Sequence, residues 1–246
     1  MTSSQSAYLP AGERQAMSSS GVPDSSEGPA PRFLEGLAPP DVRAVLAAAT
    51  ERRFPAGAVV TTQGAHADHL FLLTTGRARY FFVTEEGRKL ILLWLPPGEM
   101  FGGVALTPRP SRYLVSTETV RPSRMLVWKR STIRNLAARN PRLTENALAI
   151  ASDYLSIYVA THVALTCHTA RQRLARLLTH LAWGFGHKVQ GGIELDVTNE
   201  DLANAANVSY FTASRLLSEW NRDGILAKER GKVLLRSPEL LFRWSA

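Results

Sequence analysis

The stretch VTNEDLANAANVSYFTASRLLSEWNRDGILAKERGKVLLR, residues 197–236, predicts two short helices followed by a β-hairpin. Thr198 can accept a hydrogen bond from an otherwise unpaired amide at the start of the first helix, and Asp201 stands at the third helical position of a shortened capping box. Residues 207–208 supply a tight turn, and Ser209 caps the second helix. Two helices joined by such a turn and followed by a hairpin are typical of a winged helix-turn-helix.

The outward face of the second helix carries polar and aromatic side chains that a recognition helix would place in the major groove of DNA. The guanidinium of Arg215 matches guanine in two hydrogen bonds, the hydroxyl of Ser214 can donate to a phosphate, and the ring of Phe211 can contact a thymine methyl group. In the alternative interpretation, Tyr210 and Phe211 pack under the wing or against a neighbouring helix, and Arg215 pairs with a carboxylate. The predicted DNA-binding residues are Thr198, Ser209, Tyr210, Phe211, Thr212, Ser214, Arg215 and Lys232.

The composition favours a soluble globular protein with a polyanionic partner. Its 246 residues are 45% hydrophobic, which is enough for real cores in one large or two modest domains. The 29 Lys and Arg residues exceed the 21 Asp and Glu residues, so the net charge is +8 and nucleic acid is the natural candidate. We find neither an apolar run of about 18 residues nor a signal peptide, and the single cysteine, Cys167, excludes an internal disulfide. We therefore expect a cytoplasmic protein with no membrane partner.

The first half of the chain changes from a polar tail to a series of short strands. Residues 1–31 are rich in Ser, Gly and Pro, and they predict a disordered tail. From Phe54 to Trp128 the chain reads as short apolar strands, and glycines recur about every ten residues between Gly57 and Gly102. Regular turn signals between short apolar strands are typical of a β-sandwich or a β-roll.

The stretch FPAGAVVTTQGAHADHLFLLTTGRARYFFVTEEGRKLILLWLPPGEMFGG, residues 54–103, resembles the cyclic-nucleotide-binding β-roll of the bacterial cyclic-AMP receptor and fumarate-nitrate regulator (Crp/Fnr) family. The resemblance implies an α+β fold with a β-roll sensor domain (32–139), a long dimerisation helix and hinge (140–168) and a winged helix-turn-helix DNA-binding domain (169–246). It also implies a homodimer that reads a pseudo-palindromic operator in double-stranded DNA. In this family an effector binds the roll and reorients the two DNA-binding heads.

The helix predicted from residue 140 to about residue 165 has two apolar stripes, so it needs two partners. The resemblance implies that one stripe lies on the chain's own β-roll and the other on the second subunit. We assign the dimer interface to a stripe that steps by alternate threes and fours, as in the seam of a coiled coil. The stripe consists of Ala147, Ile150, Tyr154, Ile157 and Thr161. The alternative is a core helix of a single chain. Near residues 166–169 the helix should break, where Thr169 can cap a new helix with Gln172.

The resemblance also predicts that cyclic AMP is not the effector. In the family, a Gly-Glu pair binds the ribose hydroxyl, and an Arg-Ser pair further along binds the cyclic phosphate. Here Tyr113 and Leu114 stand at the second pair, and Arg112 is one position away, where a strand points its side chain to the opposite face. We expect the pocket to hold another ligand or to be closed by its own tyrosines. The predicted pocket residues are Gly102, Gly103, Arg112, Tyr113 and Tyr158.

Weaker signals leave alternatives open. The basic segment 109–142 is expected to contact RNA polymerase or flanking DNA phosphates, or to be a solvated face. Histidines such as His66, His69 and His162 raise the alternative of a haem or gas sensor of the same family, but their spacing predicts no metal site and we expect no cofactor. The chain has no GxSxG or GxxxxGKS motif, so we expect no enzyme. A ligand-independent architectural DNA-binding dimer is the remaining alternative.

Overall fold

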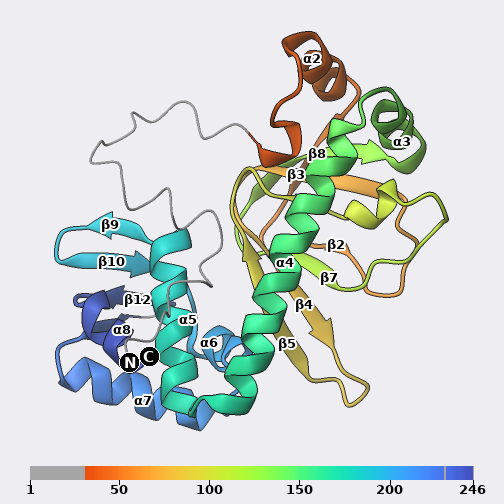
Figure 1. Cartoon of the computed structure of the whole chain (residues 1–246). Coiled ribbons are helices and arrows are strands. Elements are labelled where there is room, and N and C mark those ends of the chain that lie inside the picture. The colour runs from red at the N-terminus through yellow and green to blue at the C-terminus, as the bar shows by residue number, and fades with distance from the viewer. Residues whose placement is uncertain (1–30, 230, 246) are drawn as a thin grey trace, which may run out of the picture. The chain divides into compact units, whose positions relative to one another are not determined.

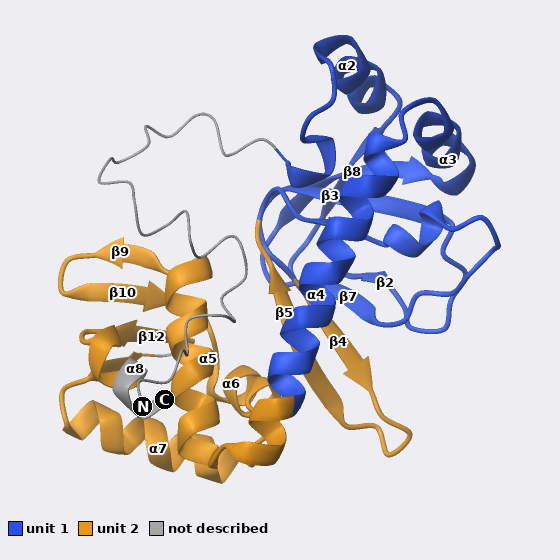
Figure 2. Cartoon of the chain, in the orientation of Figure 1, with its two compact units in different colours: residues 1–78, 97–162 blue, residues 79–96, 163–246 orange. Residues whose placement is uncertain are grey.

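The computed structural model describes residues 31–229 and 231–245, and the disordered tail predicted for residues 1–31 lies almost entirely outside them. The chain divides into two compact units (Figure 2). Unit 1 contains residues 1–78 and 97–162, and unit 2 contains residues 79–96 and 163–246. Unit 2 thus combines a strand pair from the first half of the chain with the C-terminal helices and strands.

Unit 1 contains a four-stranded sheet in the order β1-β8-β3-β6 and the antiparallel pair β2 and β7. In the four-stranded sheet, His69 lies opposite Lys129 and Thr50 lies opposite Val127. The elements of unit 1 are η1 (Arg32–Leu34), α2 (Pro39–Ala47), β1 (Thr50–Phe54), β2 (Val59–Thr61), β3 (His69–Thr75), β6 (Met100–Phe101), η2 (Gly103–Leu106), β7 (Ser116–Thr119), β8 (Ser123–Lys129), α3 (Arg130–Arg139) and α4 (Arg142–Cys167), whose last residues belong to unit 2.

The core of unit 1 lies between one face of this sheet and the helices around it. Leu70, Leu72 and Trp128 alternate with residues of the opposite face, and they pack with buried side chains of η1, α2, α3 and α4. The indole Nε1 of Trp128 donates a hydrogen bond to the carbonyl oxygen of Val45 (2.8 Å), which satisfies the polar atom of a fully buried side chain. Figure 1 shows α4 running along this face as the longest helix.

Unit 2 is a winged helix-turn-helix domain together with the β4–β5 hairpin, and the predicted α+β fold class is confirmed. Its wing belongs to a sheet in the order β11-β12-β10-β9. The elements of unit 2 are β4 (Ala78–Val83, which starts in unit 1), β5 (Lys89–Leu95), α5 (Ala170–Phe185), β9 (His187–Val189), β10 (Gly192–Leu195), α6 (Asn199–Ala205), α7 (Tyr210–Arg222), β11 (Leu226–Glu229), β12 (Lys232–Leu235) and α8 (Pro238–Ser245).

Two local features fix how the helices and strands of unit 2 begin and meet. The helix α4 ends at Cys167, and Thr169 and Gln172 form a capping box at the start of α5, so the predicted break is confirmed. In the wing sheet, a Cβ atom at Gly192 would lie 2.1 Å from the carbonyl oxygen of Leu235, and the backbone of Gly192 has φ +151°. Only glycine allows strands β10 and β12 to approach so closely.

The helix-turn-helix is held by a small core between α6 and α7. Leu202 and Ala203 of α6 and Ala213, Leu217 and Trp220 of α7 are all buried. The small side chain at Ala203 permits the close crossing of the two helices, as the sequence predicts. This packing leaves the opposite face of α7 free for another partner.

Candidate nucleic-acid interface and ligand site

The two helices of the DNA-reading module are capped as predicted. The hydroxyl of Thr198 accepts a hydrogen bond from the backbone N–H of Asp201 (3.1 Å), and the carboxylate of Asp201 accepts one from the backbone N–H of Thr198 (3.3 Å). The hydroxyl of Ser209 accepts a hydrogen bond from the backbone N–H of Thr212 (3.1 Å) at the start of α7. Asn207 takes a positive φ of 50° in the turn between the helices. The hydroxyls of Thr198 and Ser209 therefore have structural roles as well as their predicted contacts to DNA.

The outward face of α7 presents two large aromatic side chains. Tyr210 is 53% exposed and Phe211 is 83% exposed, and their rings meet edge to face with centroids 6.1 Å apart. The alternative in which they pack under the wing is therefore wrong. Ser214 is half-buried on the same side of the helix and Arg215 is exposed. An exposed aromatic pair on an otherwise well-packed helix is typical of a binding surface.

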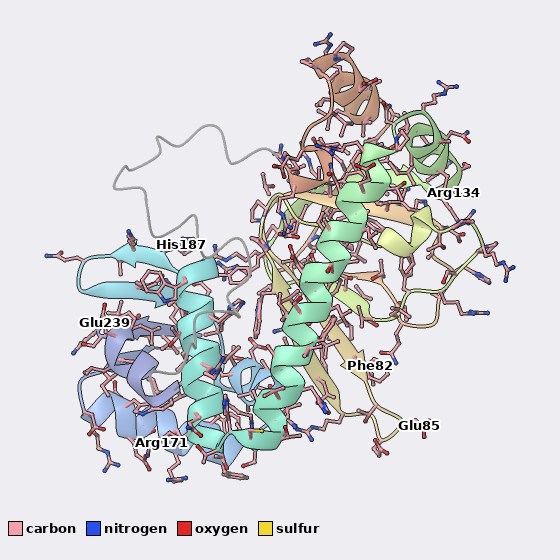
Figure 3. All side chains as sticks on the ribbon, viewed as in Figure 1. Phe82, Glu85, Arg134, Arg171, His187 and Glu239 are labelled. Atoms are coloured by element: carbon pink, nitrogen blue, oxygen red, sulfur yellow. The ribbon has the colours of Figure 1, made fainter. Side chains whose placement is uncertain are left out.

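Arg215 and Lys232 each have a carboxylate partner within the chain. The guanidinium of Arg215 pairs with Glu219 one helical turn away (2.7 Å), so the pairing alternative is confirmed. Arg171 of α5 pairs with the same carboxylate, and Figure 3 shows Arg171 near the start of α5. Lys232 pairs with Glu194 across the wing sheet (2.7 Å). Because exposed ion pairs contribute about 0–1 kcal/mol, both cations can exchange these partners for DNA.

Two of the predicted pocket residues of unit 1, Gly102 and Tyr113, are brought together. Gly102 has a φ of +76°, and a Cβ atom there would lie 2.8 Å from the carbonyl oxygen of His69 and 3.3 Å from the ring of Tyr113. Tyr113 is 9% exposed, and its hydroxyl donates to the carbonyl oxygen of His69 (2.8 Å) and accepts from the N–H of His69 (3.2 Å). Burial raises the pKa of the Tyr113 phenol above its usual value. The side chain of Tyr113 thus fills space beside Gly102.

The other predicted pocket residues lie in different environments. Gly103 is the first residue of η2. The side chain of Arg112 is exposed and donates a hydrogen bond to the carbonyl oxygen of Gly64 (2.5 Å), so it does not share the environment of the buried Tyr113. Tyr158 is half-buried on α4, and burial raises its pKa. Arg112 and Tyr113 are adjacent in the chain, but one side chain is exposed and the other is buried.

The exposed apolar surface of α4 differs from the stripe predicted for dimerisation. Ile150 is 2% exposed, and Ala147 and Tyr154 pack with it against the chain's own core. The hydroxyl of Tyr154 also donates to the carboxylate of Glu99 (2.8 Å). The burial of Ile150 contradicts its assignment to a subunit interface, whereas Ala147 and Tyr154 are half-buried and their assignment stays a prediction. Ile157 is half-buried and Thr161 is exposed.

A different row of α4 faces solvent. Its members, with their exposed fractions, are Leu148 (70%), Leu155 (63%), Val159 (52%) and Val163 (48%). The sequence alone does not show which side of α4 the β-roll covers, because apolar residues lie on more than one side of this helix. Among the described helices, α4 is also the one long and apolar enough to cross a membrane by length and composition alone.

The β4–β5 hairpin contacts the reading module through residues that the sequence did not indicate. Within unit 2, Arg79 pairs with Asp201 of α6 (2.5 Å), and Arg88 donates a hydrogen bond to the side-chain oxygen of Asn207 (2.8 Å). β5 packs against α6. Figure 3 labels Phe82 and Glu85 on this hairpin. No local pattern predicts contacts between residues so far apart in the chain.

The described residues contain no group of three or more His, Cys, Asp or Glu side chains that could hold a metal ion. His66 is exposed in a loop of unit 1. The ring of His69 lies 6.1 Å from that of Phe71, and burial, followed by the nearby charge of Arg52, lowers the pKa of His69.

Comparisons with known proteins agree with this architecture. Residues 51–140 match the cyclic nucleotide-binding domain, and residues 172–244 match the Crp-like helix-turn-helix domain. The cyclic AMP receptor protein of Thermus thermophilus is 30% identical over 210 residues, which cover 85% of this chain and 94% of that protein. A CRP-like cAMP-activated global transcriptional regulator of Mycobacterium tuberculosis is 25% identical over 213 residues, covering 86% and 95%. The solved structure of the c-di-GMP responsive global regulator CLP of Xanthomonas campestris has a TM-score of 0.71 at 22% identity, covering 80% of this chain and 98% of that one.

Proposed function

Because this chain belongs to the Crp/Fnr family of bacterial transcription regulators, we propose that it is a homodimeric, sequence-specific DNA-binding regulator whose β-roll senses a small-molecule effector. The observation that carries the proposal is the outward face of α7, where exposed Tyr210, Phe211 and Arg215 stand on a capped helix of a winged helix-turn-helix. A recognition helix uses such a face to read base edges in the major groove. The domain boundaries predicted from the sequence remain part of this proposal.

The exposed row of α4 supports the dimer. Leu148, Leu155, Val159 and Val163 form an apolar surface on a helix whose other side is buried in the chain's own core. A second copy of α4 would remove this surface from water, which is favourable at about 25 cal/mol per Å² of apolar area. A helix that crosses a bilayer by itself is apolar all round, whereas one side of α4 already packs against the chain's own core. We therefore favour a subunit contact and a cytoplasmic location.

We propose that the effector is not cyclic AMP, although two relatives are named for cyclic AMP. Tyr113 stands where the family has a phosphate-binding residue, and its buried hydroxyl is already bonded to the backbone of His69. Arg112, the nearest arginine, is exposed and bonded to Gly64. A cyclic phosphate buried beside Tyr113 would lack a cation, which is costly. The effector is instead a ligand with little dependence on phosphate, or the pocket is closed.

The β4–β5 hairpin belongs to the β-roll in sequence and contacts the DNA-binding domain, so it can transmit a change in the roll to that domain. Its arginines contact α6 and the turn before α7 within unit 2. A change in the roll that moves this hairpin would therefore also move the DNA-binding domain. These contacts would provide a basis for the reorientation that the resemblance to the family implies. RNA polymerase is a further proposed partner, with the basic segment 109–142 as its candidate surface.

The test is selection of DNA by the purified full-length chain from a random-sequence library, followed by affinity measurements on the recovered sequences. We expect a pseudo-palindrome whose half-sites lie about 10 bp apart, one per subunit. Arg215→Ala should lose sequence preference at one position of each half-site. Recovery of no preferred sequence, or of a single asymmetric site bound by one chain, would contradict the proposal.

A further inference from the structure

The hairpin carries two arginines that meet the reading module in different ways. Arg79 and Asp201 form an ion pair whose side chains are only 15% and 17% exposed, so this contact is shielded from water. The hydrogen bond from Arg88 to Asn207 is at the surface, in the turn that leads into α7. One contact thus anchors the hairpin on α6, and the other holds an exposed cation near the recognition helix.

The charges around Arg88 favour a negatively charged partner for its guanidinium. The first turn of α6 carries Glu200 and Asp201, whose carboxylates would repel DNA phosphates. Arg79 compensates Asp201, and Arg88 lines a groove together with Glu200, Ser209 and Tyr210. α7 begins at Tyr210, and the start of a recognition helix is the part that enters the major groove. When the start of α7 enters the major groove of DNA, a cation at this place would lie beside the phosphates that border that groove.

We propose that Arg88 contacts the DNA phosphate backbone beside the recognition helix and that Arg79 positions it, so that the sensor hairpin forms part of the DNA interface. The inference rests on the proposed function in DNA binding and extends the interface beyond the C-terminal domain. The present partner of Arg88 is a neutral amide oxygen. A hydrogen bond to a phosphate is charge-assisted and about twice as strong, so DNA competes well for this guanidinium.

The test measures DNA affinity as a function of salt with a random-sequence duplex, which requires no knowledge of the operator. Arg88→Gln can keep a hydrogen bond to Asn207 but loses the charge. Because each dimer carries two copies of Arg88, we expect binding to weaken by roughly 10- to 100-fold at low salt. The slope of log affinity against log salt should fall by about 1.8, or about 0.9 for each of the two phosphate contacts. Arg79→Gln should weaken binding as well, because the hairpin loses its anchor.

Lys89→Gln is the matched control. It removes the same charge from the next residue of the same hairpin, where the ammonium lies over the ring of Phe81 (4.3 Å) instead of at the turn. We expect its salt slope to equal that of the wild type. An equal loss in Lys89→Gln, or an unchanged slope in Arg88→Gln, overturns the inference. Tighter binding by Arg88→Gln also overturns it, because the hairpin would then obstruct DNA. A wild-type chain that binds no DNA refutes the proposed function itself.

Discussion

Leu155→Asp is expected to convert the dimer into a monomer without unfolding the chain. Leu155 is 63% exposed in the middle of the apolar row on α4. Burial of a Leu or Val side chain is favourable by about 1.5–3 kcal/mol. At the exposures of this row, each side chain contributes about 1–2 kcal/mol, and the four residues of two subunits contribute about 8–16 kcal/mol before the cost of association. Two facing aspartates remove part of this gain and add unpaired charges to an apolar contact.

The assay is light scattering after size exclusion at micromolar concentration. The chain has a mass of 27.0 kDa, so the wild type should elute at about twice that mass and the variant at the mass of one chain. Ala160→Asp is the control, because Ala160 is exposed on the same helix and the helical step of about 100° per residue places it to one side of the row. A Leu155→Asp chain that keeps the mass of the dimer, or a wild-type chain that is monomeric, would refute the reasoning.

The remaining predictions concern the head and the pocket. Arg215→Ala should weaken operator binding by about 1–3 kcal/mol and relax specificity, as measured by competition with point-mutated operators; unchanged preference would remove Arg215 from the base contacts. Gly192→Ala should destabilise the wing sheet, since its Cβ would meet Leu235 at 2.1 Å, and a thermal melt that matches the wild type would contradict this. Tyr113→Phe loses both hydrogen bonds to His69, which should cost about 1–3 kcal/mol of unfolding free energy in denaturant titrations. Calorimetric titration of the wild type with cyclic AMP should show no micromolar binding, and such binding would mean that the pocket can admit a phosphate.

Local sequence signals predicted the reading module well because its structure depends on neighbouring residues. The caps at Thr198 and Ser209 bond to amides three residues away, and the inward residues of α7 follow helical spacing. The same holds for the break after Cys167, where Thr169 and Gln172 cap each other. In each case, the donor and the acceptor of the hydrogen bond lie within one helical turn of each other in the sequence.

Contacts between distant residues could not be predicted in this way. Apolar residues lie on more than one side of α4, and only the position of the β-roll decides that Ile150 is buried while Leu155 is exposed. The pairing of Arg79 with Asp201 joins residues 122 positions apart. The position of Tyr113 could be counted from the sequence, but its hydrogen bonds to the backbone of His69 depend on how the segment that holds Tyr113 approaches strand β3.

The carboxylate of Asp201 has a double use that restricts how this protein can vary. One oxygen, Oδ2, accepts from the backbone of Thr198, and the other, Oδ1, accepts from Arg79. Asparagine has one acceptor oxygen in place of two, and the longer side chain of glutamate would move both. A substitution at Asp201 would therefore change the start of a helix and the docking of a distant hairpin in the same step. We expect natural variants of this chain to change Arg79 and Asp201 together.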